Sequence, residues 1–364
     1  MRGLPTLAGL RARAATVALA ASAVASSGCQ FLFPTPIEGQ EVDTRPSGAV
    51  RTLGDGFLPG ERFRAEVLLD GVVAGTGEIR VGARCSIDGR TALPVVSTGR
   101  SAGIVKMFQS ARSDVRTLVD AETNTPIEAA WDMKLGARGQ VLDQLFGEGS
   151  YRFKQTREVP DKPAKTSYGE LRLPFDGTPH DGHTSLGHLR HWKPDPGARG
   201  HIYAIYGRYV WRADLTYRGV ETVTTPLGTQ RASRIDGLAT KLLGKDLKPS
   251  ALTPHRPFTM WISDDERRVP LRVLVETALA KVTLEVVGYE RDAAVAEAPI
   301  VPCEPRVDAK PIEKGVAAKK QREEARLEKK REQAAARGEV EETETEDERE
   351  EREDREAVEK LLGK

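Results

Sequence analysis

The sequence predicts a mainly β protein, a curved antiparallel sheet or partly closed barrel with one or two short helices, followed by a charged helical or disordered C-terminal tail. Between residues 60 and 289, short runs of β-branched and aromatic residues alternate with polar ones, a pattern typical of strands that bury one face. Turn-forming Gly, Pro, Asn and Asp separate these runs. From residue 304 onward, charged residues dominate the chain and almost no apolar face remains.

Two segments are typical of β-hairpins. Asp70-Gly71, a dipeptide preferred in two-residue hairpin turns, lies between the alternating runs of "ERFRAEVLLDGVVAGTGEIRV". In "DVRTLVDAETNTPIEAAWDM", polar turn residues precede Pro126, which opens the return strand. Asp264 and Asp265 in "WISDDERR" could bind a cation, but neighbouring residues of a strand point to opposite faces. We therefore expect a third hairpin turn there, with surface ion pairs to the two arginines that follow.

The same region contains one clear alternating run and three candidate helices. In "VPLRVLVET", the valines and Leu271 occupy every second position, so they are expected to face inward. Helices are predicted for residues 139–147 ("GQVLDQLFG"), for the histidine-rich residues 180–192 and for residues 238–247 ("LATKLLGKDL"). We expect the whole region to form one domain rather than two.

The N-terminus is typical of an export signal. Three arginines precede the apolar run "AATVALAASAVA", which is shorter than the roughly 20 residues needed to cross a bilayer. The "SSGC" that follows resembles a bacterial lipobox and predicts lipidation of Cys29. The alternative is ordinary cleavage after Ala25, which would release a soluble periplasmic protein. Gln30 is not the Asp that retains lipoproteins at the inner membrane, so we expect an outer-membrane lipoprotein facing the periplasm.

These features divide the chain into four parts. Residues 1–28 form the signal peptide, and residues 29–58, rich in Pro, Gly and Thr, form a tether. Residues 59–292 form the antiparallel β domain, and residues 293–364 form the charged low-complexity tail. In an oxidising compartment, lipidation of Cys29 leaves Cys85 and Cys303 as a candidate disulfide. The alternative is two unrelated thiols.

The tail has strongly segregated charge. Residues 319–337 carry eight basic and four acidic residues, whereas residues 339–356 carry twelve acidic and three basic ones. Charges three or four positions apart can support a solvated helix, but the tail lacks the apolar a and d positions of a true coiled coil. It is expected to be solubilising, part helical and part disordered. The alternative is a docking tail for a cationic partner or a divalent cation.

Four of the six histidines lie in "HDGHTSLGHLRHW", residues 180–192, and a fifth is His201. If Asp181 caps a helix, residues three apart share a face, so His188 and His191 are the candidate metal pair. His183 points away from that pair. We expect an amphipathic helix with imidazoles on its polar side and with Leu186 and Leu189 buried.

Two longer stretches carry a family resemblance. "GERFRAEVLLDGVVAG" and "FTMWISDDERRVPLRVLVET" resemble the bacterial envelope family known as domain of unknown function 3108, over residues 60–289. That family has a central element resembling Asp-x-x-x-Ser-x-x-x-Leu-Arg, matched here by Asp181, Ser185, Leu189 and Arg190. The resemblance implies no established activity. Its architecture is similar to the curved sheets of periplasmic lipoprotein carriers, which hold acyl chains against a helix.

These observations favour a non-enzymatic envelope protein. Its β domain is expected to bind a lipid or other apolar ligand, or a partner protein, without a cofactor. The sequence contains no nucleophile elbow, P-loop, dinucleotide fingerprint or zinc-protease motif, and its net charge of +1 gives no indication of nucleic-acid binding. One alternative is a metal-dependent hydrolase using residues 180–201 with Asp181 or Asp195. Another is a structural envelope protein that interacts through its charged tail.

Overall fold

The computed structural model describes residues 48–50, 56–108, 110–173, 178–207, 209–243, 247–249, 255–276 and 280–337. The predicted signal peptide, Cys29 and most of the tether lie outside these residues, as does the acidic end of the tail. The mainly β prediction is confirmed, because the described chain forms one open, curved and largely antiparallel sheet with few helices. Among its described helices, none has the length and apolar character needed to span a bilayer.

The strands are β1 (Gly48–Ala49), β2 (Glu61–Leu69), β3 (Val72–Val81), β4 (Cys85–Ile87), β5 (Arg90–Ser101), β6 (Ala111–Asp120), β7 (Pro126–Leu135), β8 (Arg138–Gly147), β9 (Ser150–Glu158), β10 (Lys165–Arg172), β11 (Pro179–His180), β12 (Arg199–Tyr206), β13 (Tyr209–Thr225), β14 (Gly228–Leu243), β15 (Lys248–Pro249), β16 (Arg256–Ser263), β17 (Pro270–Glu276), β18 (Lys281–Arg291) and β19 (Val301–Pro302). The helices are α2 (Gly103–Phe108), α3 (Gly182–His191), α4 (Ala293–Ala296) and α5 (Ala309–Arg337).

The long strands follow one another in the order β10-β9-β8-β7-β6-β5-β3-β2-β18-β17-β16-β14-β13-β12, and each neighbouring pair is antiparallel. Pairing of β2 with β18 joins the beginning of the domain to its end, with Leu69 opposite Val282. Short strands add to this arrangement: β1 and β11 lie parallel to β12, and β19 lies parallel to β4.

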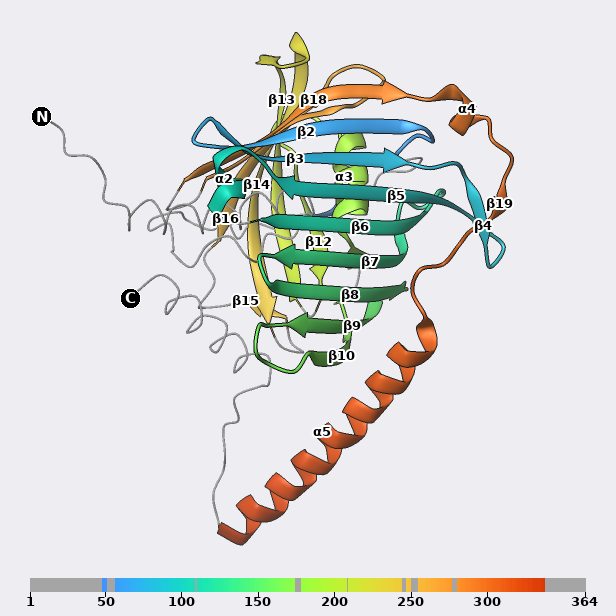
Figure 1. The fold of residues 1–364 in the computed structure, drawn as a ribbon, viewed down its shortest axis with the longest axis vertical. Coiled ribbons are helices and arrows are strands. Elements are labelled where there is room, and N and C mark those ends of the chain that lie inside the picture. Colours follow the sequence, from blue (N-terminus) through green and yellow to red (C-terminus); the bar gives the residue numbers. More distant parts are fainter. Residues whose placement is uncertain are drawn as a thin grey trace, which may run out of the picture.

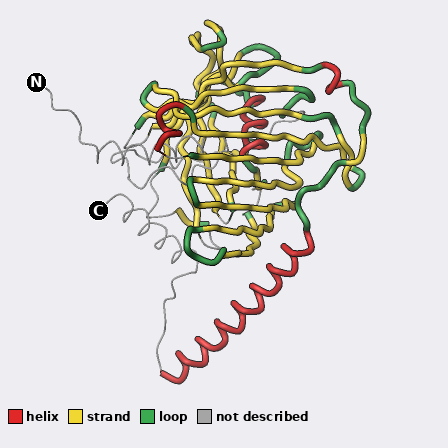
Figure 2. Tube along the Cα trace, in the orientation of Figure 1, coloured by secondary structure: helices red, strands yellow, loops and turns green. Residues whose placement is uncertain are grey.

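The sheet bends so that its two halves form two layers. Strands β2 to β10 run across the view of Figure 1, whereas β12 to β16 lie behind them and run roughly at right angles to them. Helix α3 lies between the two layers, behind the front strands (Figure 2). Apolar side chains from both layers meet on the concave face, including Trp131 and Leu142 from the front and Ile205 and Val210 from the back. The core is therefore enclosed by one sheet folded over itself.

Local sequence explains the hairpins. Asp70 and Gly71 both adopt positive φ values, 47° and 84°, as a two-residue type I′ turn requires. The turn joins β2 to β3 as predicted. The second predicted hairpin is β6–β7, and the third is β16–β17. In that last hairpin, Leu271 is buried and Val273 packs on the concave side, as its alternation indicates.

Two of the predicted helices are strands. Residues 139–147 belong to β8, where Gln140, Leu142 and Gln144 are buried at every second position. The predicted helix at 238–247 is the end of β14 as far as Leu243. Each run is short, and a short apolar run does not distinguish the helical period from the strand period. Each segment pairs with a neighbouring strand on both sides, which provides hydrogen-bond partners for its backbone N–H and C=O groups. Both segments therefore form strands.

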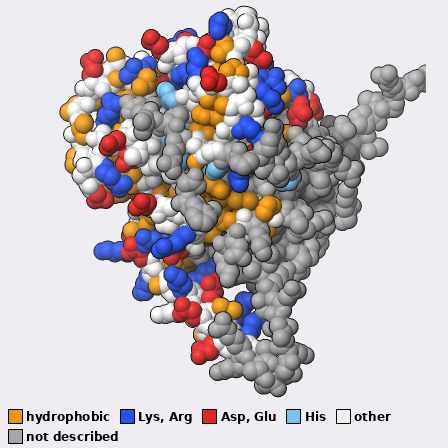
Figure 3. Space-filling view, turned by 180° about the vertical axis from the view of Figure 1, so that it is seen from behind, with side chains coloured by type: hydrophobic (Ala, Val, Ile, Leu, Met, Phe, Trp, Pro, Cys, Tyr) orange, Lys and Arg blue, Asp and Glu red, His pale blue; other side chains and the backbone are white. Residues whose placement is uncertain are grey.

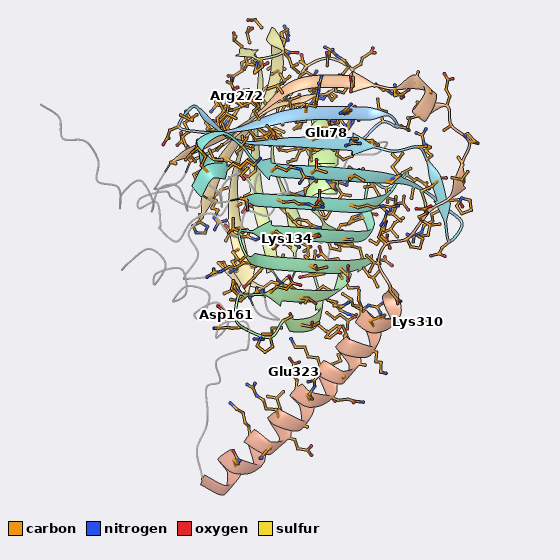
Figure 4. The ribbon with its side chains drawn as sticks, in the orientation of Figure 1. Glu78, Lys134, Asp161, Arg272, Lys310 and Glu323 are labelled. Atoms are coloured by element: carbon orange, nitrogen blue, oxygen red, sulfur yellow. A yellow bond between two sulfur atoms is a disulfide. The ribbon has the colours of Figure 1, made fainter. Side chains whose placement is uncertain are left out.

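The beginning of the tail packs on the convex face of the sheet. The sequence predicts only a solvated segment for these residues. Cys303 forms a disulfide with Cys85 in β4. Beyond it, the backbone N–H groups of Arg306 and Val307 donate to the carboxylate of Glu128 at 2.8 and 3.3 Å. Three apolar tail residues then pack on the sheet, namely Val307, Ile312 and Val316. Lys310 lies beside the sheet and Glu323 farther along the projecting helix (Figure 4).

Candidate ligand-binding site on the concave face

Helix α3 begins where the sequence predicts it. The Asp181 carboxylate accepts a hydrogen bond from the backbone N–H of Thr184 at 2.9 Å, and the Thr184 hydroxyl accepts one from the backbone N–H of Asp181 at 3.1 Å. This capping box satisfies N–H groups that the first turn leaves without helical partners. The helix ends at His191, and Leu189 and Leu186 pack against the core as expected.

The histidines differ from the prediction, because most of them are buried rather than on a polar side. His180, His183, His188 and His201 are each less than a tenth exposed, whereas His191 is exposed. The two sheet layers enclose α3, so this helix has almost no solvent-facing side. The candidate metal pair, His188 and His191, is therefore divided between the interior and the surface. In the part of the chain that the structure describes, no three His, Cys, Asp or Glu side chains form a group that could hold a metal ion.

Burial lowers the pKa of three of these imidazoles, those of His180, His183 and His188. Desolvation lowers the pKa of His188 to about 4, and it lowers the pKa of His180, whose ring lies edge-on to that of His188 with centroids 4.5 Å apart. The Thr117 hydroxyl donates to the Asp181 carboxylate and lies 2.7 Å from Nδ1 of His183. Since that hydroxyl already uses its proton, the geometry places the His183 proton on Nδ1. Desolvation also lowers the pKa of His183, against the opposing charge of Asp181.

Arg190 at the end of α3 is the largest fully buried side chain among the described residues. Its guanidinium donates to both carboxylate oxygens of Glu61, at 2.9 and 2.6 Å. It also donates to the carbonyl oxygens of Gly56, Arg267 and Arg268, at 2.8–2.9 Å. The rings of Phe57 and Phe63 lie on it, each with its centroid 5.1 Å from Cζ. This contact fastens α3 to the start of the domain.

The predicted surface ion pairs of the β16–β17 turn are present only in part. Asp264 pairs with Lys193 at 2.5 Å and Asp265 pairs with Arg267. Arg268 also pairs with Asp264, at 3.8 Å, but it is buried rather than at the surface, and its Nε donates to the carbonyl oxygen of Arg190 at 2.6 Å. The turn therefore packs against the end of α3, which explains why this arginine does not reach solvent.

Away from α3, the concave face carries buried polar groups that the sequence reasoning did not single out. Ser113 in β6, Trp131 in β7 and Gln144 in β8 all face inward, at most 2% exposed. The strand register places them on a diagonal, because Val115 lies opposite Trp131 and Ala129 lies opposite Gln144. The Ser113 hydroxyl, the Trp131 indole N–H and both ends of the Gln144 amide have no hydrogen-bond partner among the described residues. The signal in the sequence that they share is a polar side chain at a strand position where the alternation points inward.

A satisfied polar group lies beside this diagonal. Gln140 Nε2 donates to the Tyr206 hydroxyl at 2.7 Å, and that hydroxyl lies 3.0 Å from Sδ of Met133. The Tyr206 ring meets the Trp131 ring edge-on, with centroids 4.6 Å apart. The back layer thus holds the Trp131 ring in place.

On the face opposite to that of Figure 1, hydrophobic side chains gather in the middle of the molecule, with histidines beside them (Figure 3).

Residues 62–287 match the model of a family described as a protein of unknown function, DUF3108. The chain belongs to the DUF3108 family. The matched range covers the sheet from β2 to β18, including α3 with Asp181, Ser185, Leu189 and Arg190. In this DUF3108 domain, Asp181 caps the helix, Leu189 and Arg190 are buried, and Ser185 is half-buried. No curated protein matches the chain.

Solved structures give weak likenesses to the DUF3108 domain. A β-barrel-like protein of domain of unknown function DUF1849 from Brucella abortus is 10% identical, with a TM-score of 0.41, covering 65% of this chain and 98% of that one. A protein described as a lipoprotein from Parabacteroides distasonis is 11% identical, with a TM-score of 0.32, covering 66% and 100%. A protein described as exported, with a YmcC-like fold, from Bacteroides fragilis is 7% identical, with a TM-score of 0.29, covering 66% and 99%. At these TM-scores the likenesses carry no conclusion about a ligand.

In the DUF3108 domain, the described residues of the hydrolase alternative form two buried pairs, His183 with Asp181 and His180 with His188, rather than one metal-binding group. Asp181 is fully buried and occupied as a helix cap, and Asp195 is exposed in the turn before β12. His201 is buried on β12 with its ring against Tyr203, centroids 5.4 Å apart. The concave diagonal of Ser113, Trp131 and Gln144 is therefore the stronger candidate site.

Proposed function

We propose that this protein is an exported, lipid-anchored envelope protein whose concave face binds an apolar molecule carrying a hydrogen-bonding group, without chemical conversion of that molecule. One observation carries the proposal. Ser113, Trp131 and Gln144 form a line of buried polar groups among the apolar side chains of the concave face, and they have no hydrogen-bond partner among the described residues. Most buried polar groups in folded proteins have a partner, and an orphaned one costs roughly 1–3 kcal/mol. A bound ligand removes that cost.

The chemistry of the three residues indicates the ligand class. The Trp131 indole can only donate, whereas the Ser113 hydroxyl and the Gln144 amide can donate and accept. A carbonyl or ester oxygen can accept from the indole, the serine hydroxyl and the amide N–H, whereas the Gln144 amide oxygen needs a donor such as a hydroxyl. Around them lie Leu142, Phe153 and other apolar side chains, which suit hydrocarbon chains. An acyl lipid combines both kinds of group, since it has ester oxygens next to long apolar chains.

The location follows from the N-terminus. The export signal and the "SSGC" before Cys29 support anchoring by a lipid on Cys29, in the outer membrane and facing the periplasm. Changing Cys29 to Ala is expected to move the protein from the membrane fraction to the soluble periplasm. A wild-type protein that is already soluble and begins at Ser26 would contradict the anchor.

The binding proposal is tested with the full chain purified from its own envelope. Lipids extracted from it and identified by mass spectrometry are expected in a fixed ratio to protein. Gln144→Leu keeps the side-chain size and removes the hydrogen bonds, so affinity for a dansyl-labelled fatty acid is expected to fall roughly fivefold to tenfold. Gln321→Leu, the same change at an exposed position of α5, is the matched control. Equal affinities in the two variants, with no co-purified lipid, would refute the proposal.

A further inference from the structure

One edge of the front layer carries strongly exposed apolar side chains. Met107 in α2 is 83% exposed, and Val72, at the start of β3 beside the β2–β3 turn, is 59% exposed. Helix α2 packs against β3, where Val105 is buried and the Ala102 N–H donates to the Ala74 carbonyl oxygen at 2.9 Å. One side of the helix is thus attached to β3, while Met107 points away from the core. Isolated exposed apolar residues are common, so the charged side chains around these two residues decide what this edge can bind.

Basic side chains surround this apolar pair. Lys106 is the neighbour of Met107, and both are exposed. The Gly136 N–H donates to the Ser110 carbonyl oxygen at 2.8 Å, which brings the β7–β8 turn beside the end of α2. That turn lies between Lys134 and Arg138, and both are exposed. Figure 4 shows Lys134 toward the edge of the sheet that carries α2.

The charge balance of this edge is positive. Lys106, Lys134 and Arg138 form no ion pair with the described residues. The acidic groups nearby include Asp70, which accepts from the backbone N–H of Lys281 at 2.9 Å, and Glu158 beside Gly139. Asp132 lies two residues before Lys134, opposite Asp114, which pairs with Arg112. Exposed apolar side chains flanked by basic ones have the composition of surfaces that bind anionic bilayers, where apolar insertion and attraction to lipid phosphates add together.

We propose that the α2 edge, defined by Val72, Met107 and the flanking Lys106, Lys134 and Arg138, docks onto the surface of an anionic phospholipid bilayer. This contact goes beyond the lipid anchor at Cys29, because it orients the folded domain on the membrane rather than only tethering it. It is also independent of the ligand site, since none of these residues belongs to the concave diagonal.

The test uses the full chain carrying Cys29→Ala, so that no acyl anchor contributes. Its partition is measured by sedimentation with phosphatidylglycerol-containing vesicles and with phosphatidylcholine vesicles. Binding is expected to be stronger to the anionic vesicles and to weaken with added salt. Met107→Asp is expected to lower the partition coefficient roughly tenfold, and Lys106→Glu to lower it about as much on anionic vesicles only.

Ile300→Asp is the matched control. Ile300 is 56% exposed and lies just before β19, at the opposite end of the front strands from α2 (Figure 1). This variant is expected to bind vesicles like the parent chain, and circular dichroism checks that all variants fold. Equal partition of Met107→Asp and Ile300→Asp would overturn the proposal. A dimer that dissociates only in Met107→Asp would overturn it too, and would assign the edge to a second copy of the chain.

Discussion

Arg190 Nη2 lies 2.6 Å from a carboxylate oxygen of Glu61, and neither side chain is more than 1% exposed. The two residues are 129 positions apart, so their contact joins the end of α3 to the first long strand. Because both charges are removed from water, each depends on the other for stabilisation. The bidentate geometry and the three further carbonyl acceptors suit a guanidinium and would not suit a lysine.

Replacing Arg190 by Met is expected to destabilise the domain by roughly 3–5 kcal/mol, since it leaves the Glu61 carboxylate buried without its partner. Urea unfolding measures the loss. Arg218→Met is the control, because Arg218 pairs with Asp236 at 2.8 Å but is 55% exposed, and such surface pairs contribute under about 1 kcal/mol. Similar losses in the two variants would show that the buried pair has no special role.

Stability is expected to fall in mild acid because of His188. Burial lowers its pKa in the folded protein to about 4, whereas the unfolded value is about 6.5. Between these values the unfolded chain binds more protons, so stability is complete above about pH 6.5 and falls as the pH drops toward 4. From pH 7.5 to 5, this residue accounts for a loss on the order of 2 kcal/mol.

The pH effect is measured by urea unfolding at both pH values. His188→Gln is expected to reduce the difference, whereas His191→Gln, at the exposed end of α3, should leave it nearly unchanged. The same pH dependence in the parent and in His188→Gln would assign the effect to other groups, such as His180, whose pKa burial also lowers.

The disulfide between Cys85 and Cys303 spans 218 residues, and it fastens the start of the tail to the convex face. Cys303→Ser is expected to destabilise the protein by about 2–4 kcal/mol and to expose residues 293–316 to protease. Mass spectrometry of a limited digest locates the new cuts. Cys85→Ser should have the same effect, and the double variant should be no worse than either single one. Additive losses would mean that the two thiols act separately.

Gln144→Leu is expected to stabilise the ligand-free protein by about 1–2 kcal/mol, since it removes a buried amide that has no partner. Gln140→Leu, on the same face of the same strand, should destabilise it instead, because it breaks the 2.7 Å hydrogen bond to the buried Tyr206 hydroxyl. Thermal unfolding of delipidated protein gives both values. A loss of stability in both variants would show that the Gln144 amide is already satisfied without a ligand.

Several features were determined by local sequence alone. The Asp70-Gly71 turn, the β6–β7 hairpin and the start of α3 at Asp181 depend on residues within a few positions of one another. Turn and cap preferences of this kind are decided by short-range sterics and hydrogen bonding. The mainly β class follows for the same reason, because alternation along each strand is readable without knowing its neighbours.

Tertiary structure decided the rest. Residues 139–147 form a strand because β7 and β9 pair with both of their edges, and those partners cannot be read from a run of nine residues. The imidazoles of His183 and His188 in α3 are buried because the sheet folds over both sides of the helix, whereas an amphipathic pattern assumes one side in water. No feature of the neighbouring sequence distinguishes Gln144 from a glutamine on the surface. Its burial depends on strands distant in sequence, because desolvation is a property of everything that surrounds a side chain and not of its neighbours along the chain.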